Sequence, residues 1–446
     1  MNFPHAALHV PTILLPSERT DPSAWAVVAC DQYTSQPDYW ERVKAQVGDR
    51  PSTLKLILPE AFLGSDDTER TYRRIAENMR DYERDGVLAP QPPGFILVQR
   101  RTSRNATRRG LVVALDLEAY DFREGATTLI RASEGTVVER LPPRARIREQ
   151  ATVEVPHVMV LIDDPEQTVI EPLFDEALPT AYDFDLMAGA GHITGYHVRE
   201  ERLLRKVAIN LERLSAPELF SLRYGVGDRP PLLYAIGDGN HSFATAKVVW
   251  EKIKEEAGPD VLHSHPARFA LVEIVNVHDP GLVFEPIHRV VSRVEPGALL
   301  ARMQQYYARN GSTCSHRTFA TAAEAETVAR AAASRAGHRI HFVTGDSHGV
   351  LFVDTPRSAL PTGSLQSFFD WCEANGEPAA IDYIHGDEAL GELATRPGCV
   401  GFYLPPLSKH DLFRTIILDG ALPRKTFSMG EPDEKRFYLE CRRIVP

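Results

Sequence analysis

The sequence predicts a mixed α/β fold, in which mixed sheets carry flanking helices. Strand-length apolar runs alternate with helical patterns along much of the chain, an order typical of α/β and α+β architectures. At several places two apolar runs follow each other across a short polar turn, which predicts hairpins. Hairpins beside strand–helix–strand units favour sheets with both parallel and antiparallel neighbours. The 446 residues are enough for two or three domains or subdomains.

The first third of the chain supplies strands, helices and one long hairpin. Residues 24–29 (AWAVVA) and 52–59 (STLKLILP) are apolar and short, as buried strands are. Residues 37–48 and 66–88 have the apolar spacing of amphipathic helices. Residues 94–121 place a basic polar loop between two apolar runs, which predicts a hairpin with a solvated turn.

The middle third continues the alternation. Residues 155–164 (VPHVMVLIDD) and 191–198 (GHITGYHV) are expected to be strands, and residues 199–213 a charged amphipathic helix. A strand, a polar loop and a helix follow over residues 231–253. Residues 267–291 predict two strands joined by a turn at Asp-Pro-Gly.

The last third predicts a further α/β region. Residues 295–311 and the Ala-rich residues 320–337 have helical patterns, and residues 338–354 predict a hairpin. We therefore expect three parts, listed by their residue ranges: an N-terminal α/β subdomain at 1–125, a central core at 126–292, and a C-terminal α/β subdomain at 293–446 that folds back on the site.

Composition excludes several classes of protein. The net charge is −11, which argues against broad nucleic-acid binding, because that function needs a basic face. The five cysteines are scattered and never in C-x-x-C spacing, so a disulfide framework is not expected and a reducing compartment fits best. The N-terminus lacks the pattern of a signal peptide, and the apolar runs are too short to span a bilayer. We expect a cytoplasmic protein without a membrane partner.

Residues 234–247 (YAIGDGNHSFATAK) hold the most informative loop. Gly237 and Gly239 allow backbone conformations that other residues resist. Asn240 and Ser242 are good helix-capping residues, and the apolar positions after them have helical spacing. The stretch therefore predicts a strand, a tight loop and the N-terminus of a helix.

Two interpretations of this loop remain open from the residues alone. Free N–H groups at a helix N-terminus attract anions, so Asp238 could hold a metal ion or a proton while His241 contacts a phosphate or carboxylate. Alternatively, the loop is a capped turn in which Asp238 bonds its own backbone. The loop contains neither the Walker phosphate-binding pattern nor the G-x-G-x-x-G pattern of dinucleotide-binding proteins.

Several motifs together resemble one protein family. The segments GDGNHSFATAK, EPIHRVV and LPRKTFSMGEPDEKRFYLE look like the DUF1015 family, a group of bacterial and archaeal proteins of unassigned function. The resemblance extends from VPTILLP and VACDQYTSQPDYW near the N-terminus to the C-terminal segment. It implies a core similar to that of ParB-like proteins that phosphorylate free serine with a nucleotide. Relatives tend to lie near serine-biosynthesis genes, which makes serine or phosphoserine the leading substrate.

The resemblance also implies roles for residues of the loop and of a second segment. In many relatives the loop is Asp-Gly-His-His-Arg, and in the ParB-like kinases the loop aspartate and a glutamate assist phosphoryl transfer. Asp238 stands at that aspartate position here, and Glu134 with Thr136 matches a His-Glu-x-Thr pattern of the relatives. Glu134 could act as a general base toward a hydroxyl group. The alternative is an exposed loop in which Glu134 pairs with arginines.

The sequence departs from the relatives at the loop arginine. Arginine binds phosphate with two parallel hydrogen bonds, and Ser242 occupies its place here. Another cation must serve the phosphate, or the chemistry differs. The candidates for supplying positive charge are Arg131, Arg140, Arg144, Arg289 and Lys425. Asn240, Ser242 and Thr136 are further candidates for binding the substrate or its phosphate.

The segments around residues 288 and 425 supply further candidates. His288 and Arg289 are consecutive, and neighbouring residues of a strand face opposite sides, so they can share one pocket only if the strand has ended. A structural role is favoured for His288 and an anion-binding role for Arg289. Lys425 and Ser428 could present an ammonium and a hydroxyl to a phosphate or carboxylate; the alternative is a surface hairpin of mixed charge.

Asp31 is a separate candidate, because ligands of open α/β sheets bind beyond the carboxyl ends of strands and Asp31 directly follows one. It could equally cap a turn. The sixteen histidines form none of the common zinc patterns, so no transition metal is expected. A magnesium ion carried by ATP or ADP needs only one or two carboxylates, and Asp238 is the candidate ligand.

Two functional hypotheses follow. The first is an enzyme that transfers phosphate to a small hydroxyl metabolite, with Asp238 and Glu134 as catalytic carboxylates. His241, Arg289 and Lys425 would then stabilise phosphate charge. Hydrolysis of a phosphomonoester such as phosphoserine would need the same pocket. The second is a non-catalytic nucleotide or small-molecule sensor, which the serine at position 242 makes credible.

Overall fold

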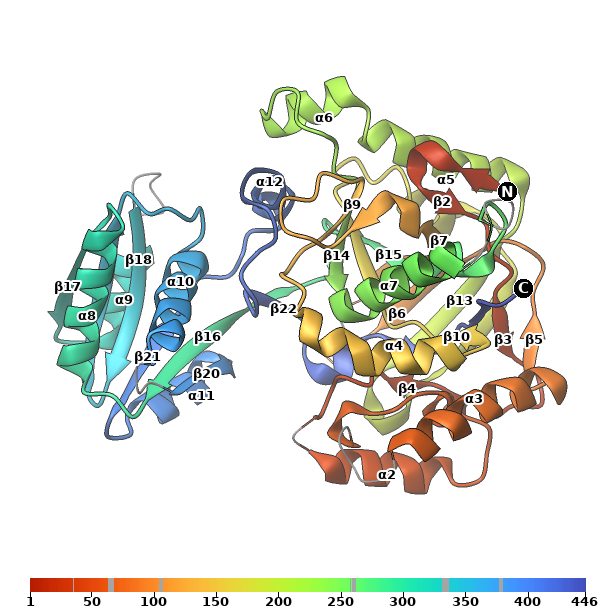
Figure 1. Cartoon of the computed structure of the whole chain (residues 1–446), viewed down its shortest axis with the longest axis horizontal. Helices are drawn as coiled ribbons and strands as arrows, with labels where there is room; N and C mark the ends of the chain where they lie inside the picture. The colour runs from red at the N-terminus through yellow and green to blue at the C-terminus, as the bar shows by residue number, and fades with distance from the viewer. Residues whose placement is uncertain are drawn as a thin grey trace. The chain divides into compact units, whose positions relative to one another are not determined.

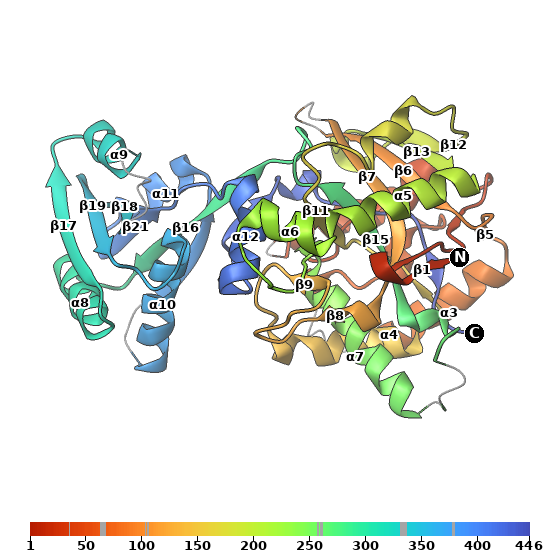
Figure 2. The same cartoon turned by 90° about the horizontal axis from the view of Figure 1, so that it is seen from above.

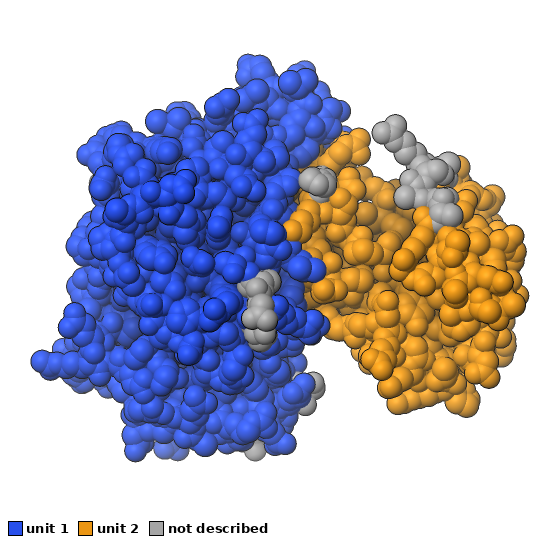
Figure 3. Space-filling view, turned by 180° about the vertical axis from the view of Figure 1, so that it is seen from behind, with its two compact units in different colours: residues 1–283, 429–446 blue, residues 284–428 orange. Residues whose placement is uncertain are grey.

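The protein, seen here as a computed structural model, has two compact units. Unit 1 comprises Met1–Val283 together with Met429–Pro446, and unit 2 comprises Phe284–Ser428 (Figure 3). The predicted mixed α/β fold is confirmed, because helices alternate with strands in both units and the large sheet of unit 1 has both parallel and antiparallel neighbours (Figure 1). The structure describes residues 1–34, 36–62, 68–102, 104, 107–256, 258, 262–330, 337–376 and 380–446.

Unit 1 is built around one large mixed sheet. Its main path runs β12-β13-β6-β7-β15-β11-β14-β9-β8, and β2 extends it from β7 with β1 paired to β2. The strands are β1 (Asn2–Phe3), β2 (Leu8–His9), β6 (Phe95–Arg101), β7 (Thr107–Asp116), β8 (Tyr120–Asp121), β9 (Ile130–Ala132), β11 (Met159–Ile162), β12 (Thr180–Asp185), β13 (His192–Val198), β14 (Tyr234–Asp238) and β15 (Phe269–Asn276).

Helices and short strand pairs complete unit 1. The helices are α1 (Pro22–Trp25), α2 (Pro37–Val47), α3 (Thr68–Arg84), α4 (Leu141–Gln150), α5 (Glu201–Leu214), α6 (Pro217–Tyr224) and α7 (Asn240–Glu256). The short pairs are β3 (Leu14–Pro16) with β5 (Leu88–Pro90), β4 (Val27–Val28) with β23 (Phe437–Tyr438), and β10 (Val153–Glu154) with β24 (Arg442–Arg443). Helices α4 and α7 run side by side (Figures 1 and 2).

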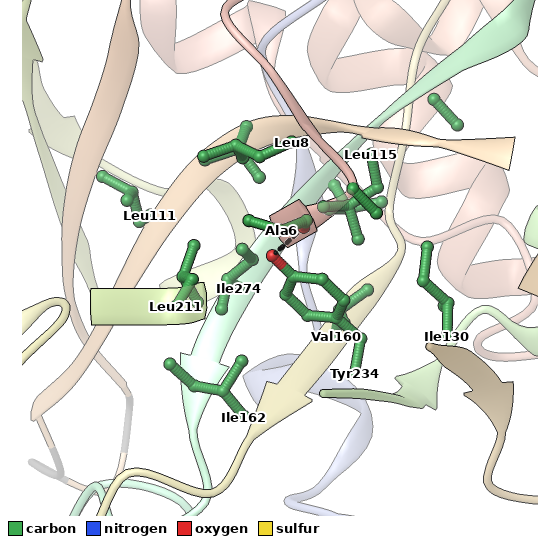
Figure 4. Close-up of a cluster of buried hydrophobic side chains, with 14 of the residues drawn as sticks. Ala6, Leu8, Leu111, Leu115, Ile130, Val160, Ile162, Leu211, Tyr234 and Ile274 are labelled. Atoms are coloured by element: carbon green, nitrogen blue, oxygen red, sulfur yellow. Dashed lines mark hydrogen bonds between the residues drawn. The ribbon is translucent and has the colours of Figure 1, made fainter. Parts of the chain in front are cut away.

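Alternation along the strands gives the large sheet two buried faces. In β7, Leu111 and Val113 join the cluster that packs against α5 and α7, whereas Val112 joins the cluster that contains α2 and α3. Figure 4 shows part of the first cluster, in which the Tyr234 hydroxyl donates a hydrogen bond of 2.8 Å to the carbonyl of Ala6. Burial on both faces explains why these strands are continuously apolar in the sequence.

Unit 2 has its own sheet and its own hydrophobic core. The strand order is β17-β19-β18-β21-β16-β20. The strands are β16 (Phe284–Ser292), β17 (Thr313–Phe319), β18 (Gly337–Thr344), β19 (Ser347–Asp354), β20 (Ala380–His385) and β21 (Cys399–Tyr403), and the short β22 (Phe427–Met429) pairs with β16. The helices are α8 (Pro296–Arg309), α9 (Ala322–Arg330), α10 (Pro361–Ala374), α11 (Asp387–Ala394) and α12 (Lys409–Asp419).

Several predicted elements are confirmed, one is wrong, and the strand predicted at 24–29 forms only as β4 because its first two residues belong to α1. The hairpin at 94–121 forms as β6 and β7, and the hairpin at 338–354 forms as β18 and β19. Residues 52–59 do not form a strand; Thr53–Leu56 form a 3₁₀ turn, η2. The Ser52 side chain accepts a hydrogen bond from the backbone N–H of Leu54, which caps this turn. The helix predicted at 66–88 begins at residues that lie outside the described part of the chain.

The predicted division into three parts stays a prediction. The boundary at residue 125 falls within unit 1, between β8 and β9, which pair in parallel in the large sheet. The boundary at residue 292 coincides with the end of β16, inside unit 2. No helix that the structure describes is long and apolar enough to cross a membrane.

Candidate functional site

The predicted carboxylates Glu134 and Asp238 belong to the same edge of the large sheet. Strands β9 and β14 are parallel neighbours, and their last paired residues are Ala132 and Ile236. Glu134 and Asp238 each stand two positions beyond that last pair. Neighbouring parallel strands end at the same edge of a sheet. Glu134 and Asp238 therefore lie at neighbouring strand ends, although they are 104 positions apart in the sequence. We call this place the Asp238 edge.

Asp238 is the last residue of β14 and is held by two donors. One carboxylate oxygen, Oδ1, accepts a hydrogen bond of 2.9 Å from the backbone N–H of Gly239. The other, Oδ2, lies 3.3 Å from the Nζ atom of Lys435, which comes from the C-terminal segment of unit 1. Burial raises the pKa of Asp238, but the positive charge of Lys435 and the proximity of His157 outweigh it, so the pKa lies below its ordinary value.

Gly239 forms the turn from β14 into α7. Its φ of +77° lies in the left-handed region, where side chains are strained. A Cβ atom at this position would also lie 3.0 Å from Cγ2 of Val158 and 3.4 Å from Nε2 of His157. The loop therefore needs glycine here both for its backbone angle and for the close approach of the segment before β11.

His157 joins the Asp238 edge to a buried hydrogen-bond chain. The Tyr438 hydroxyl accepts from the backbone N–H of Cys30 at 3.2 Å and lies 2.8 Å from Nδ1 of His157. The Nε2 atom of His157 lies 3.9 Å from a carboxylate oxygen of Asp31. Asp31, predicted as a candidate after a strand, is thus part of this group.

On its other side, the Asp238 edge is closed by the loop after β9. The backbone N–H of Val137 donates to Nε2 of His241 at 3.3 Å, so this loop contacts the first turn of α7. Three buried polar atoms of this region have no hydrogen-bond partner among the described residues: Oγ of Ser133, Oγ1 of Thr136 and Oδ1 of Asn240. A buried polar group without a partner costs about 1–3 kcal/mol, so their gathering marks a place that a ligand or water can satisfy.

Comparison with known proteins identifies the family. The family model described as "Protein of unknown function (DUF1015)" matches residues 13–370. The chain belongs to the DUF1015 family. This confirms the resemblance found in the loop motifs. No curated protein matches it.

Solved structures similar to this DUF1015 protein have low identity. A mutant of a free serine kinase in complex with AMP has a TM-score of 0.39 and 11% identity, over 75% of this chain and 91% of the other. A conserved hypothetical protein from Pyrococcus furiosus has a TM-score of 0.37 and 10% identity, over 75% of this chain and 95% of the other. SbnI with a C-terminal truncation, from Staphylococcus aureus, has a TM-score of 0.33 and 11% identity, over 72% of this chain and 83% of the other. We base the function of the DUF1015 protein on its site instead.

Three predicted phosphate-binding residues have other surroundings in this DUF1015 protein. The Arg131 guanidinium donates to four backbone carbonyls, those of Thr127, Thr128, Pro230 and Pro231. Arg140 is exposed and precedes α4. Ser242, in the first turn of α7, lines an apolar cavity. Arg144, the further basic candidate, pairs with Glu60 on the wall of the same cavity.

The remaining predicted residues belong to unit 2. His288 lies inside β16, where Nε2 is 2.7 Å from a carboxylate oxygen of Asp387 and Nδ1 accepts from the N–H of Leu404. Arg289 is fully buried and donates to the carbonyls of Ile287, Arg424 and Lys425, among others. The Lys425 side chain is exposed, and Ser428 is half-buried.

Lys435 is a residue of the candidate site that sequence reasoning missed. It belongs to the predicted C-terminal segment, in which Lys425 and Ser428 were chosen instead. A signal was present, since Lys435 precedes the run RFYLE, of which Phe437 and Tyr438 form the buried strand β23. His157 and Tyr438 gave no comparable signal, because their partners are distant in the chain.

Buried arginines hold the segment that carries Lys435. Arg100 donates to the carbonyls of Asp433 and Lys435 at 2.7 and 2.6 Å, and Arg108 to that of Glu434 at 3.1 Å. Next to them, Arg436 donates to the carboxylates of Glu273 and Glu440, each at 2.8 Å. The Lys435 backbone is thereby fixed against the sheet, which positions its ammonium at Asp238.

The donor set at the Asp238 edge fits a hard cation only in part. Among the described residues, no three His, Cys, Asp or Glu side chains are placed to hold a metal ion together. Asp238 and Glu134 supply two carboxylates at one edge, which is the number that a magnesium ion carried by a nucleotide uses.

Proposed function

We propose that this protein transfers a phosphoryl group from a nucleotide to the hydroxyl of a small metabolite, with serine as the leading acceptor. The observation that carries the proposal is the placement of Glu134 just after β9 and of Asp238 at the last residue of the parallel strand β14. Phosphoryl transfer depends mainly on positioning and charge stabilisation, and it needs carboxylates for the acceptor proton and for the cation of the donor.

The two carboxylates take different roles. The lowered pKa of Asp238 keeps it ionised, which suits it to orienting the acceptor hydroxyl or a cation rather than to taking up a proton. Glu134 is the general base: the acceptor oxygen bonds to phosphorus, its proton moves to Glu134, and the bond to the nucleotide breaks. The products are a phosphomonoester and a nucleotide with one phosphate fewer. Mg²⁺ carried by the nucleotide would be held by Asp238 and would supply positive charge to the phosphates.

The surroundings of Asp238 supply positive charge for an anion. Helix α7 runs from Asn240 to Glu256, long enough for its N-terminal amides to carry a partial positive charge at this edge. The ammonium of Lys435 lies beside the same carboxylate, 11% exposed. The unpartnered hydroxyls of Ser133 and Thr136 are donors for phosphate oxygens. His241 positions the loop that carries them, through the N–H of Val137.

Phosphorus NMR tests the proposal. The full chain is supplied with Mg²⁺, with ATP, ADP, CTP or pyrophosphate as donor, and with a pool of small hydroxyl metabolites that includes serine. A new phosphomonoester signal is expected. Phosphoserine alone, in a parallel sample, tests the reverse use of the site, in which water is the acceptor and inorganic phosphate is released. Unchanged spectra in every sample would overturn the proposal.

A matched pair of variants assigns the activity to this edge. Asp238→Asn removes the charge without changing the shape, so turnover should fall about 10³-fold while donor binding changes little. Asp228→Asn makes the same change at an exposed position and should leave turnover unchanged. Equal turnover in the two variants would place the chemistry elsewhere.

A second candidate function is nucleotide or metabolite binding without transfer. The observation that favours it is that the Arg131 guanidinium is occupied by backbone carbonyls, while serine stands at the loop position of the relatives' arginine. A binding protein should broaden or shift the donor's phosphorus signals without forming product. In that case Asp238→Asn would change affinity, and no turnover would be lost.

A further inference from the structure

An apolar cavity of about 160 Å³ lies in unit 1, next to the Asp238 edge. Its walls come from the turn η2 with the residues after it and from α3, α4, α7 and β15. The side chains that define its shape are Leu56, Leu58, Met79, Ile147, Phe243 and Leu271. In another protein, an apolar cavity of about 150 Å³ stays dry and takes up benzene. The volume here therefore suits a group of about one ring.

The charges on the cavity wall are already balanced. Arg148 donates to Glu154 at 2.7 Å, and Arg144 pairs with Glu60. Glu154 also accepts from Arg442 at 2.7 Å. Because each acid on the wall has a basic partner, the wall offers no net attraction to a charged ligand. The group that enters must be uncharged.

One end of the cavity is polar and belongs to the candidate site. Ser242 lies in the first turn of α7, four positions after Asp238, and its side chain lines the cavity. His157 lines it as well, and the same ring lies against Gly239. Thr245 also borders the cavity, but its hydroxyl donates to the carbonyl of His241 at 2.7 Å. Ser242 and His157 are thus the groups through which the cavity meets the Asp238 edge.

We propose that this cavity binds the uncharged, ring-sized apolar group of a ligand whose polar end reaches Ser242 and His157 at the Asp238 edge. The inference rests on the proposed function and narrows its ligand, because serine alone has no apolar group to fill the cavity. The shared chemistry is a flat or compact apolar ring. It comes either from the acceptor or from the base of the nucleotide donor.

Ligand-detected NMR on the full chain, without any phosphate donor, tests the cavity. The probes are benzyl alcohol, toluene and adenosine. Benzyl alcohol should bind more tightly than toluene, because its ring fills the cavity and its hydroxyl reaches Ser242. Absence of binding by all three probes would overturn the proposal.

Two variants locate the binding. Ala246 lines the cavity and is 2% exposed, so the larger side chain of Ala246→Leu fills the space. The affinity for benzyl alcohol should fall at least tenfold. Ala45→Leu adds the same side chain at an exposed position of α2 and should change nothing. Equal affinity in the two variants would contradict the proposal. The melting temperature of each variant shows whether it has folded.

A gentler variant keeps the test valid if Ala246→Leu does not fold. Ser242→Ala removes one hydroxyl and should lower the affinity for benzyl alcohol about fivefold, which corresponds to about one lost hydrogen bond. The affinity for toluene should stay the same. Equal loss for both probes would rule out Ser242 as the polar contact and would contradict the proposal.

Competition then separates the two sources of the ring. If adenosine binds and benzyl alcohol displaces it, the cavity takes the nucleotide base; if adenosine does not bind while benzyl alcohol does, it takes the acceptor. Both outcomes support a ring site. A cavity that binds rings in a protein that transfers no phosphate would refute only the proposed function, because these measurements contain no donor.

Discussion

Asp238 in unit 1 and Arg289 in unit 2 are both charged residues of strands, yet their surroundings differ. Asp238 ends β14, its side chain is 20% exposed, and it faces the ammonium of Lys435. Arg289 lies within β16, is fully buried, and donates to backbone carbonyls while its guanidinium stacks 4.4 Å from the centre of the Tyr383 ring.

We infer from this difference that the carboxylate of Asp238 can bind a ligand, whereas the guanidinium of Arg289 stabilises the backbone. A guanidinium surrounded by carbonyls satisfies the backbone, and moving it to bind an anion would leave those carbonyls unpaired. Arg131 in unit 1 follows the same rule as Arg289. A carboxylate at a strand end, paired with the ammonium of one lysine, can exchange its partner for a substrate or cation. The measurements below test this division, beginning with the largest expected effect.

The largest effect is expected for the buried network that holds the Lys435 segment. Arg436→Met removes the cation shared by Glu273 and Glu440, and it leaves both carboxylates buried. The free energy of unfolding should fall by about 3–5 kcal/mol, as when one partner of a buried ion pair is removed. Denaturant titration measures it. Arg443→Met, whose ion pair with Glu83 is exposed on the arginine side, should lose less than about 1 kcal/mol.

Arg289→Met is the corresponding test in unit 2. The carbonyls of Ile287 and Lys425 lose their donor, so unit 2 should lose about 2–3 kcal/mol. Hydrogen exchange should show the loss in β16 and its neighbours β20 and β21. Arg317→Met, at an exposed position of β17, is the control. Protection that is unchanged in β16 would mean that Arg289 is not structural.

Lys435→Gln tests the electrostatics of the Asp238 edge itself. Burial raises the pKa of Asp238, and the ammonium of Lys435 lowers it. When the ammonium is removed, the pKa of Asp238 should therefore rise. Carbon NMR of the labelled carboxylate follows this titration. Lys252→Gln, at a half-exposed ion pair on α7, should leave the pKa of Asp238 where it is. A pKa of Asp238 that does not move would remove Lys435 from the site.

A smaller effect is expected from one histidine in each unit. Burial and Arg199 lower the pKa of His197 in unit 1 to about 4, and burial and His348 lower the pKa of His341 in unit 2 to about 4. The unfolded residues keep a pKa near 6.5. Their contribution to stability is thus complete above pH 6.5 and is lost as the pH falls from 6.5 toward 4. His197→Gln and His341→Gln should each flatten this part of the pH profile of unfolding.

Much of the fold was predictable because local patterns decide it. The strand, loop and helix around Asp238, the hairpin of β6 and β7, and helix α5 all follow from spacing and from Gly239. The turn at residues 53–56 was missed because its apolar residues resemble a strand, while a serine cap and contacts with Trp25 decide its shape.

The composition of the candidate site was less predictable, because its contacts join distant parts of the chain. The sequence indicated Asp238 and Glu134 through motif resemblance, and the parallel pairing of β9 with β14 that brings them to one edge has no local signal. Likewise, His157 and Tyr438 are ordinary core residues by pattern. Lys425 and Lys435 lie in one segment of the sequence. The hydrogen bond from Arg100 to the carbonyl of Lys435 fixes the position of the second lysine, and the sequence pattern does not reveal this contact.

The order of the chain has a consequence for synthesis. Residues 429–446 belong to unit 1 but are made after all of unit 2. While unit 2 is leaving the ribosome, Asp238 lacks Lys435, and Glu273 lacks the partner that Arg436 supplies. A chain that stops before Met429 therefore contains both carboxylates of the Asp238 edge, while the buried Glu273 keeps Arg108 at 3.8 Å but lacks Arg436. Such a fragment should be less stable than the full chain, because residues 429–446 complete the ion pairs of Asp238 and Glu273 in unit 1.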